Sequence, residues 1–207
     1  MTKQTAYREV VQRSDDSWVR LPVMRIQGPK KGKTLLLTAG VHGDEFEGML
    51  AIQRLFDELT PAQLSGTLIA IPRANPPAFD AGLRTNPDAR QDMARVFPGD
   101  AAGTVTEQIA HILTHEFIAK ADFYCDLHSA GQYYAMPPLV GYQLRESLLE
   151  PQRMAARAMG MKVIWGTPGL PGRSLSAAAD HGVPAIYTEI TGEGRCRAAD
   201  VDCYLQG

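Results

Sequence analysis

The chain has 207 residues, enough to bury one substantial hydrophobic core, and a single domain over residues 1–207 is expected. Its 21 Lys and Arg against 23 Asp and Glu give a formal charge of -2, so no strong field draws it to nucleic acid or to an anionic membrane. A small molecule or a peptide is therefore the expected partner, and the composition leaves a homo-oligomer open.

The N-terminus, MTKQTAYREVVQRSDDSWVR, lacks the apolar segment of a secretory signal, and the apolar runs are too short to span a bilayer. Cys125, Cys196 and Cys203 are odd in number and widely separated, without a CxxC pattern. Neither a disulfide framework nor a structural zinc site is expected from them. These features predict a cytoplasmic protein with reduced thiols.

The first motif along the chain is GPKKGKT, at 28–34. A phosphate-binding P-loop follows a strand, opens a helix and has four residues between its glycines. Here only three residues separate the glycines, and the motif precedes a strand. A basic turn between two strands is expected.

Short apolar runs then alternate with longer amphipathic segments, a βαβ rhythm that favours a mainly parallel, mixed sheet with helices on its faces. The stretch 73–103 is rich in proline and shows no sustained period, as in loops that are functional or disordered. The expected strands are 34–40, 67–72, 121–128, 162–165 and 183–190; the expected helices are 44–59, one that begins with a Thr104/Glu107 capping box, 143–159 and 174–181.

Three of these strands run directly into ionisable residues, in LLLTAGVHGDE, FYCDLHSAG and AIYTEITGEG. Ligand sites in open α/β sheets lie beyond the carboxyl ends of the strands, so the ionisable side chains are expected to converge there. The candidates are His42, Glu45, Asp126, His128 and Glu189.

Part of this set matches a catalytic zinc site, which takes three nitrogen or oxygen ligands and leaves one position open. His42 and Glu45 are three apart where a strand turns into a helix, and Gly43 removes a Cβ from that turn. His128 can supply the third ligand from a neighbouring strand, and Asp126, on the same strand face, can orient an imidazole. An isolated H-x-x-E is a pattern of low specificity. Here it stands at the end of one expected strand, as DLHS does at the end of another, and this shared placement favours the metal site.

Other motifs have two interpretations. His111 and His115 lie four apart in the helix that begins near Thr104, a spacing able to bind metal. Because no third ligand is evident beside them, an exposed or packed pair is expected. Tyr133 and Tyr134, in GQYYAMPP, either line a substrate pocket or pack in the interior.

With these residues assembled, the chain resembles the succinylglutamate desuccinylase/aspartoacylase family, relatives of the zinc carboxypeptidases, from about Lys33 to Gly194. Four ordered blocks carry the resemblance: AGVHGDEFEG, the segment from NPPAF to RVFPGD, D-x-x-x-DLHS at 122–129, and GVPAIYTEITG. It implies a zinc-carboxypeptidase-like α/β fold with one Zn²⁺ per chain. The implied reaction is hydrolysis of the amide bond of a small N-acylated amino acid or related amine.

The resemblance also implies roles for single residues. Glu189, in TEITG, matches the catalytic glutamate, which acts as general base and then donates the proton to the leaving amine. Arg84, in GLRTNP, is similar to the arginine that polarises the scissile carbonyl, and Arg95, in DMARVFPG, to the one that binds the substrate carboxylate. The residues that match the zinc ligands are His42, Glu45 and His128.

Two features depart from the family's pattern. The family reads D-L-N-R-x-F-P-G where residues 92–99 read DMARVFPG, so Ala94 replaces an amide and carboxylate recognition is expected to be weaker or altered. Family members continue past the catalytic glutamate into a smaller β-rich domain, whereas the chain stops at DVDCYLQG. A short natural member and a catalytic domain alone are the two expectations.

Two alternatives to the deacylase stay open. One is a metallocarboxypeptidase that acts on peptides, and the other is a non-catalytic binding module on the same scaffold. Ala94 and the missing second domain motivate the binding module, whereas the joint presence of the three ligands and the base argues against it.

Overall fold

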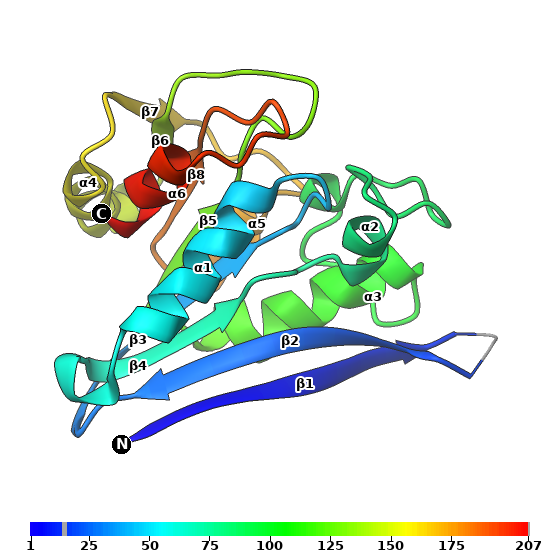
Figure 1. Ribbon diagram of the computed structural model, residues 1–207, viewed down its shortest axis with the longest axis horizontal. Helices are drawn as coiled ribbons and strands as arrows, with labels where there is room; N and C mark the ends of the chain where they lie inside the picture. The colour runs from blue at the N-terminus through cyan, green and yellow to red at the C-terminus, as the bar shows by residue number, and fades with distance from the viewer. Residues whose placement is uncertain (14–15, 207) are drawn as a thin grey trace.

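The computed structural model of the protein describes residues 1–13 and 16–206 (Figure 1). In this part of the chain one eight-stranded sheet has the order β1-β2-β4-β3-β5-β8-β6-β7. The strands are β1 (Thr2–Gln12), β2 (Trp18–Gln27), β3 (Lys30–Ala39), β4 (Ser65–Ile71), β5 (Phe123–Leu127), β6 (Leu139–Gln143), β7 (Val163–Thr167) and β8 (Ala185–Glu189). The helices are α1 (Phe46–Glu58), α2 (Pro76–Asp80), α3 (Val105–Ile112), α4 (Leu149–Ala158), α5 (Ser174–Asp180) and α6 (Ala198–Leu205).

Shorter turns of helix join these elements: η1 (Pro61–Gln63), η2 (Met93–Arg95), η3 (Leu113–Phe117), η4 (Ile118–Lys120) and η5 (Glu146–Leu148). The centre of the sheet is parallel, because β4, β3, β5 and β8 pair in the same direction. Towards the edges, β2 is antiparallel to β4 and β6 is antiparallel to β8. The predicted mainly parallel, mixed sheet is confirmed.

Helices cover both faces of the sheet, with α1, α4 and α6 on one face and α3 and α5 on the other (Figure 1). Successive side chains of a strand point to opposite faces, and both faces of the central strands are apolar. Leu36 and Tyr124 therefore join the core under α3 and α5, whereas their neighbours Leu37 and Cys125 join the core under α1, α4 and α6. The central strands, whose ends carry the candidate site described below, are therefore packed between the two cores.

The predicted strands at 34–40, 67–72, 121–128, 162–165 and 183–190 and the four predicted helices are present, with shifted ends. The capping box is confirmed: Thr104 accepts a hydrogen bond from the backbone N–H of Glu107, and the Glu107 carboxylate accepts one from the Thr104 N–H at 2.7 Å. The loop 73–103 contains α2 and η2, and is otherwise irregular.

Other parts of the prediction need correction. The strand expected before the basic turn is β2, whereas its antiparallel partner β1, the strand β6 and the helix α6 were not predicted. The helix expected at 143–159 begins at Leu149, after β6 and η5. In the basic segment the turn is confined to residues 28–29, because β3 begins at Lys30.

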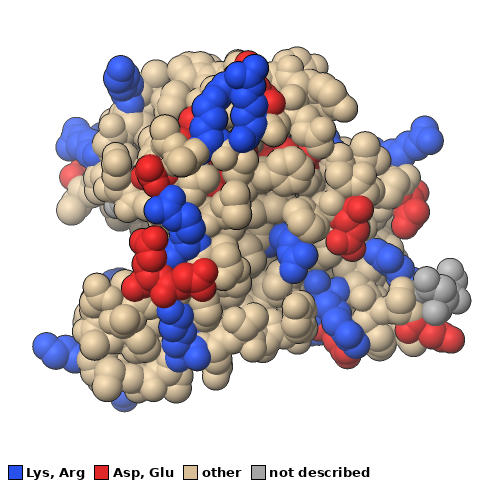
Figure 2. Space-filling view, viewed as in Figure 1, with Lys and Arg blue, Asp and Glu red and all other residues tan. Residues whose placement is uncertain are grey.

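The surface carries charges of both signs. On the face drawn in Figure 2, Lys and Arg side chains are interspersed with Asp and Glu. Among the described helices, none is long and apolar enough to cross a membrane.

Candidate metal and active site

The site forms where β3, β5 and β8 end side by side. His42 follows the last residue of β3 by a short turn, His128 directly follows β5, and Glu189 is the last residue of β8. Because β5 pairs in parallel with both neighbours, the three carboxyl ends meet at one edge of the sheet, as predicted.

The turn between β3 and α1 is held by the segment that follows β4. The Asn75 backbone N–H donates to the Gly40 carbonyl at 2.9 Å, and its side-chain amide donates to the Val41 carbonyl at 3.2 Å. A Cβ on Gly43 would lie 2.2 Å from the carbonyl carbon of Ala78 in α2. Glycine is required at position 43 because the backbone of α2 approaches so closely.

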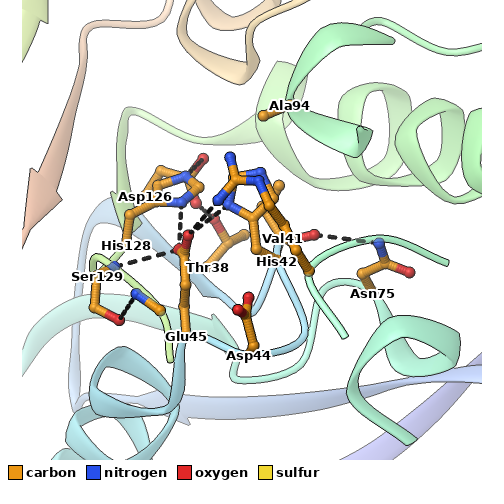
Figure 3. A network of polar contacts seen from close by, with 12 residues as sticks. Thr38, Val41, His42, Asp44, Glu45, Asn75, Ala94, Asp126, His128 and Ser129 are labelled. Carbon is orange, nitrogen blue, oxygen red and sulfur yellow. Dashed lines mark hydrogen bonds and ion pairs between the residues drawn. The ribbon is translucent and has the colours of Figure 1, made fainter. Parts of the chain in front are cut away.

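The carboxylate of Glu45 lies between two imidazoles (Figure 3). Nδ1 of His42 is 2.7 Å from Oε1, and Nδ1 of His128 is 2.7 Å from Oε2. All three side chains are buried, and one potential ligand atom from each lies within 4.8 Å of the others. Two imidazole nitrogens and a carboxylate oxygen are a donor set that suits a catalytic zinc ion.

Each imidazole has a second carboxylate at its other nitrogen. Nε2 of His128 is 3.3 Å from Asp126 Oδ2, which confirms the predicted neighbour. Nε2 of His42 is 2.9 Å from Asp92 Oδ1, a contact that was not predicted. These carboxylates fix the ring orientations and leave both Nδ1 atoms directed at Glu45, as outer partners of metal-binding histidines do.

Asp126 is itself fixed in place from two elements. The hydroxyl of Thr38 in β3 donates to Oδ1 at 2.6 Å, and the hydroxyl of Ser174, the first residue of α5, donates to Oδ2 at 2.6 Å. Tyr204 of α6 donates its hydroxyl hydrogen to the backbone carbonyl of His128. Helices on both faces of the sheet therefore hold the His128 imidazole and its backbone.

Electrostatics makes the cluster a set of ion pairs when no cation is bound. Burial on its own would raise the pKa of Glu45, but His128 and His42 outweigh it and lower that pKa to about 2. Burial disfavours protonation of His128, yet the charges of Asp126 and Glu45 raise its pKa well above the usual value. Protons then occupy the nitrogens that a metal ion would use, so metal binding releases protons.

The environment of Glu189 shifts its pKa upwards, in the opposite direction to that of Glu45. Burial raises the pKa of this carboxyl to about 7, with Glu45 adding to the rise and His128 opposing it. A carboxyl group that titrates near neutral pH is matched to accepting and returning a proton during a reaction.

Both predicted loop arginines reach the site. Arg84 donates to Glu45 Oε1 at 3.2 Å and to Asp92 Oδ2 at 3.5 Å, with its side chain about half exposed. Arg95 lies 3.9 Å from Asp92 Oδ2 and donates to the Ala94 carbonyl at 2.9 Å. The exposed parts of both guanidinium groups are available to a ligand.

Ala94 is buried near the cluster, and its backbone N–H donates to Asp92 Oδ1 at 2.9 Å (Figure 3). An adjoining cavity of about 250 Å³ is lined by Trp165, Arg173 and Tyr187, among others. Burial and the nearby Arg95 lower the pKa of Arg173, while Asp92 and Glu189 oppose this. Arg173 is thus a third cation beside the site. This residue was not predicted from the sequence, where its only signal was its position directly before the helix expected at 174–181.

The tyrosine pair lies outside the core. Tyr133 and Tyr134 are 83% and 76% exposed, so the interior-packing interpretation was wrong. Their contact with a substrate stays a prediction.

Comparisons with known proteins point to one family. Residues 31–207 match the family model described as the succinylglutamate desuccinylase/aspartoacylase catalytic domain. The N-alpha-acetyl-L-2,4-diaminobutyric acid deacetylase of Halomonas elongata is 37% identical over 191 residues, which cover 89% of this chain and 55% of that protein.

Solved structures show the same fold. The succinylglutamate desuccinylase/aspartoacylase of Rhodobacter sphaeroides has a TM-score of 0.88 and 31% identity, over 98% of this chain and 62% of that one. The product-bound ectoine utilization protein EutE of Ruegeria pomeroyi has a TM-score of 0.89 and 29% identity, over 98% and 63%. The chain thus spans 55% to 63% of the length of these three relatives.

Proposed function

The chain belongs to the succinylglutamate desuccinylase/aspartoacylase family, and on that premise we propose that it is a zinc-dependent amidohydrolase that removes the acyl group from a small N-acylated amino acid or related amine. The observation that carries this proposal is the convergence of His42, Glu45 and His128 at the strand end next to Glu189. Residues 1–207 are proposed to act as one catalytic domain.

We assign one Zn²⁺ per chain to Nδ1 of His42, Nδ1 of His128 and the carboxylate of Glu45. The donor set, its burial and the carboxylates behind both imidazoles support this assignment. When bound, such an ion lowers the pKa of a water molecule and polarises a carbonyl group.

The protein's own side chains then move the proton and stabilise charge. Glu189 accepts a proton from the attacking water and donates it to the nitrogen of the leaving amine, a role that suits its pKa of about 7. Arg84 donates to the carbonyl oxygen as negative charge develops there. Its contact with Glu45 places the guanidinium beside the proposed metal.

Substrate recognition is assigned to the remaining cations. Arg95 binds the substrate carboxylate, since a guanidinium offers paired donors to such a group. Ala94 supplies no side-chain amide next to it, so carboxylate binding depends on Arg95 and on the neighbouring Arg173. Because the Halomonas elongata relative is an N-alpha-acetyl-L-2,4-diaminobutyric acid deacetylase, that compound is the first substrate to test.

We also propose a cytoplasmic location. The thiols of Cys125, Cys196 and Cys203 are all unpaired. Reducing compartments keep thiols in this form.

The test is a substrate panel with purified, zinc-loaded protein. We expect release of acid from N-acetyl or N-succinyl amino acids, and none of this activity in His42→Ala, His128→Ala or Glu189→Gln. Glu150→Gln, the same change on an exposed carboxylate of α4, is the matched control and keeps the activity. Faster release of C-terminal residues from peptides would instead support a metallocarboxypeptidase, and no turnover of either class would support the binding module.

A further inference from the structure

The chain has five histidines, and the structure divides them into two groups. His42 and His128 belong to the site at the strand ends. The other three lie together on the α3 and α5 side of the sheet: His111 in α3, His115 in η3 and His181 at the end of α5.

The structure places a third imidazole beside the pair that the sequence shows. The ring centroids of His111 and His115 are 4.4 Å apart, and those of His115 and His181 are 5.6 Å apart. His115 and His181 are exposed and His111 is partly exposed. Three accessible imidazoles from two separate segments therefore share one patch of surface.

The tautomer of His181 leaves a nitrogen free for metal. Nδ1 lies 2.9 Å from the Ala177 carbonyl oxygen. A carbonyl only accepts hydrogen bonds, so Nδ1 carries the hydrogen, and Nε2 is the nitrogen that has a lone pair in the neutral ring. Histidines that bind metal commonly donate their other ring N–H to a backbone carbonyl in this way.

The surroundings favour metals that prefer nitrogen. Two nearby carboxylates are already paired: Glu116 accepts from Arg8 Nε at 2.8 Å, and Asp180 accepts from Arg145 at 3.0 Å. Partial desolvation and the adjacent His111 and His181 lower the pKa of His115. Imidazole donors suit Zn²⁺, Ni²⁺ and Cu²⁺, whereas Mg²⁺ and Ca²⁺ prefer oxygen.

We propose that His111, His115 and His181 form a second, solvent-accessible site for a nitrogen-preferring divalent ion, Zn²⁺ in the first place, with water completing its coordination. Unlike the ligand atoms of the buried site, which already lie within 4.8 Å of one another, the nitrogens of His111 and His115 would reach an ion at Nε2 of His181 by side-chain rotation. Rotation of exposed side chains is fast. A bound ion would link η3 to α5, the helix whose first residue, Ser174, supports Asp126.

Equilibrium dialysis against buffered Zn²⁺, with protein-bound metal counted by mass spectrometry, tests the proposal. The wild type should bind one more equivalent than His115→Ala or His181→Ala, whether or not the buried site is filled. Lys120→Ala, an exposed cation in η4 on the same segment, is the matched control and should bind as much as the wild type. Equal metal content in the wild type and His181→Ala would overturn the site.

A second measurement identifies the ligands. Addition of Ni²⁺ to protein that carries a single equivalent of Zn²⁺, in the buried site, should broaden the imidazole NMR signals of His111, His115 and His181 and spare those of His42 and His128. Mg²⁺ should broaden none. Broadening confined to His111 and His115 would overturn the three-ligand site. The His115→Ala and His181→Ala variants should keep deacylation of an N-acyl amino acid at the wild-type rate, because neither side chain belongs to the buried site.

Discussion

Glu45 is the side chain that joins the parts of the site. One oxygen faces His42 and Arg84, and the other faces His128 and accepts from the Ser129 backbone N–H at 3.2 Å. Every one of these partners can carry or direct positive charge towards the carboxylate. The carboxylate is therefore held ionised and in a fixed orientation before a cation arrives.

Substitutions of Arg84 and of Arg95 should have different effects on kcat and KM. Loss of one donor to developing negative charge typically costs about 2.7 to 4 kcal/mol, so Arg84→Ala should lower kcat roughly 100- to 1,000-fold with little change in KM. Arg95→Ala should mainly raise KM, because a carboxylate contact is made before and during the reaction alike. Steady-state kinetics on one substrate checks both. If both variants changed KM alone, Arg84 would not be the donor to the scissile carbonyl.

The carboxyl group of Glu189 should lower the free energy of unfolding of the metal-free protein near neutral pH. Its folded-state pKa of about 7 exceeds the ordinary 4.5, so the unfolded chain loses this proton at lower pH than the folded one. The free energy of unfolding of the wild type, compared with that of Glu189→Gln, is therefore highest below about pH 4.5 and falls as the pH rises to about 7. Above that range the metal-free Gln variant should be more stable by up to about 3 kcal/mol. Urea unfolding of the metal-free proteins across this range measures it, and a pH-independent difference would contradict it.

The turn from β3 to α1 depends on its contact with α2. Gly43→Ala would place a methyl group 2.2 Å from the Ala78 carbonyl carbon, so either the turn or α2 must move. We expect a loss of about 3 kcal/mol in unfolding free energy, together with weaker metal binding, since His42 and Glu45 flank the glycine. Gly82→Ala, a control glycine beyond α2, adds the strain of a φ of 63° but no clash, because an added Cβ meets no atom within 4 Å, and it should leave metal binding intact. Wild-type metal affinity in Gly43→Ala would show that the contact is not needed.

Helix α5 should influence the metal site through one hydroxyl. Ser174→Ala removes the donor 2.6 Å from Asp126, the carboxylate behind His128. Loss of such an outer partner typically weakens metal binding about 10- to 100-fold. Ser176→Ala removes a hydroxyl of the same helix that bonds the Leu170 carbonyl instead, and should bind metal normally. Competition with a chelator measures both affinities, and equal values would disprove the coupling.

The accuracy of the sequence predictions follows from local signals. The central strands were predictable because buried apolar runs end abruptly in ionisable residues, as at Leu127 and His128. β1 was not, since most of its side chains are exposed and no apolar face marks it. β6 has only five residues and contains Gly141, which packs against the Tyr187 ring.

The same holds for the site. His42, Glu45 and His128 stand at strand ends, where topology alone brings side chains together. Asp92 lies 50 residues from His42, in an irregular loop without periodicity, and only tertiary folding makes them partners. His181 joins His115 in the same way, across a contact between α5 and η3.

At the scale of the whole molecule, the two cores hold the parallel strands β3, β5 and β8, at whose ends the proposed metal ligands and the proposed base lie. The ion pairs within the cluster keep this geometry without a cation, so metal removal should abolish catalysis while the fold persists. Circular dichroism of chelated protein should therefore match that of the zinc-loaded protein. A loss of secondary structure on chelation would mean that the ion, and not the sheet, assembles the site.

Back-titration of chelated protein with Zn²⁺, followed by hydrolysis of an N-acyl amino acid, tests the central claim most directly. Activity should be absent without metal, rise linearly up to one equivalent per chain in the wild type and in His181→Ala, and stay absent in His128→Ala at any zinc concentration. Full activity in the metal-free protein, or equal recovery in His128→Ala, would contradict the account.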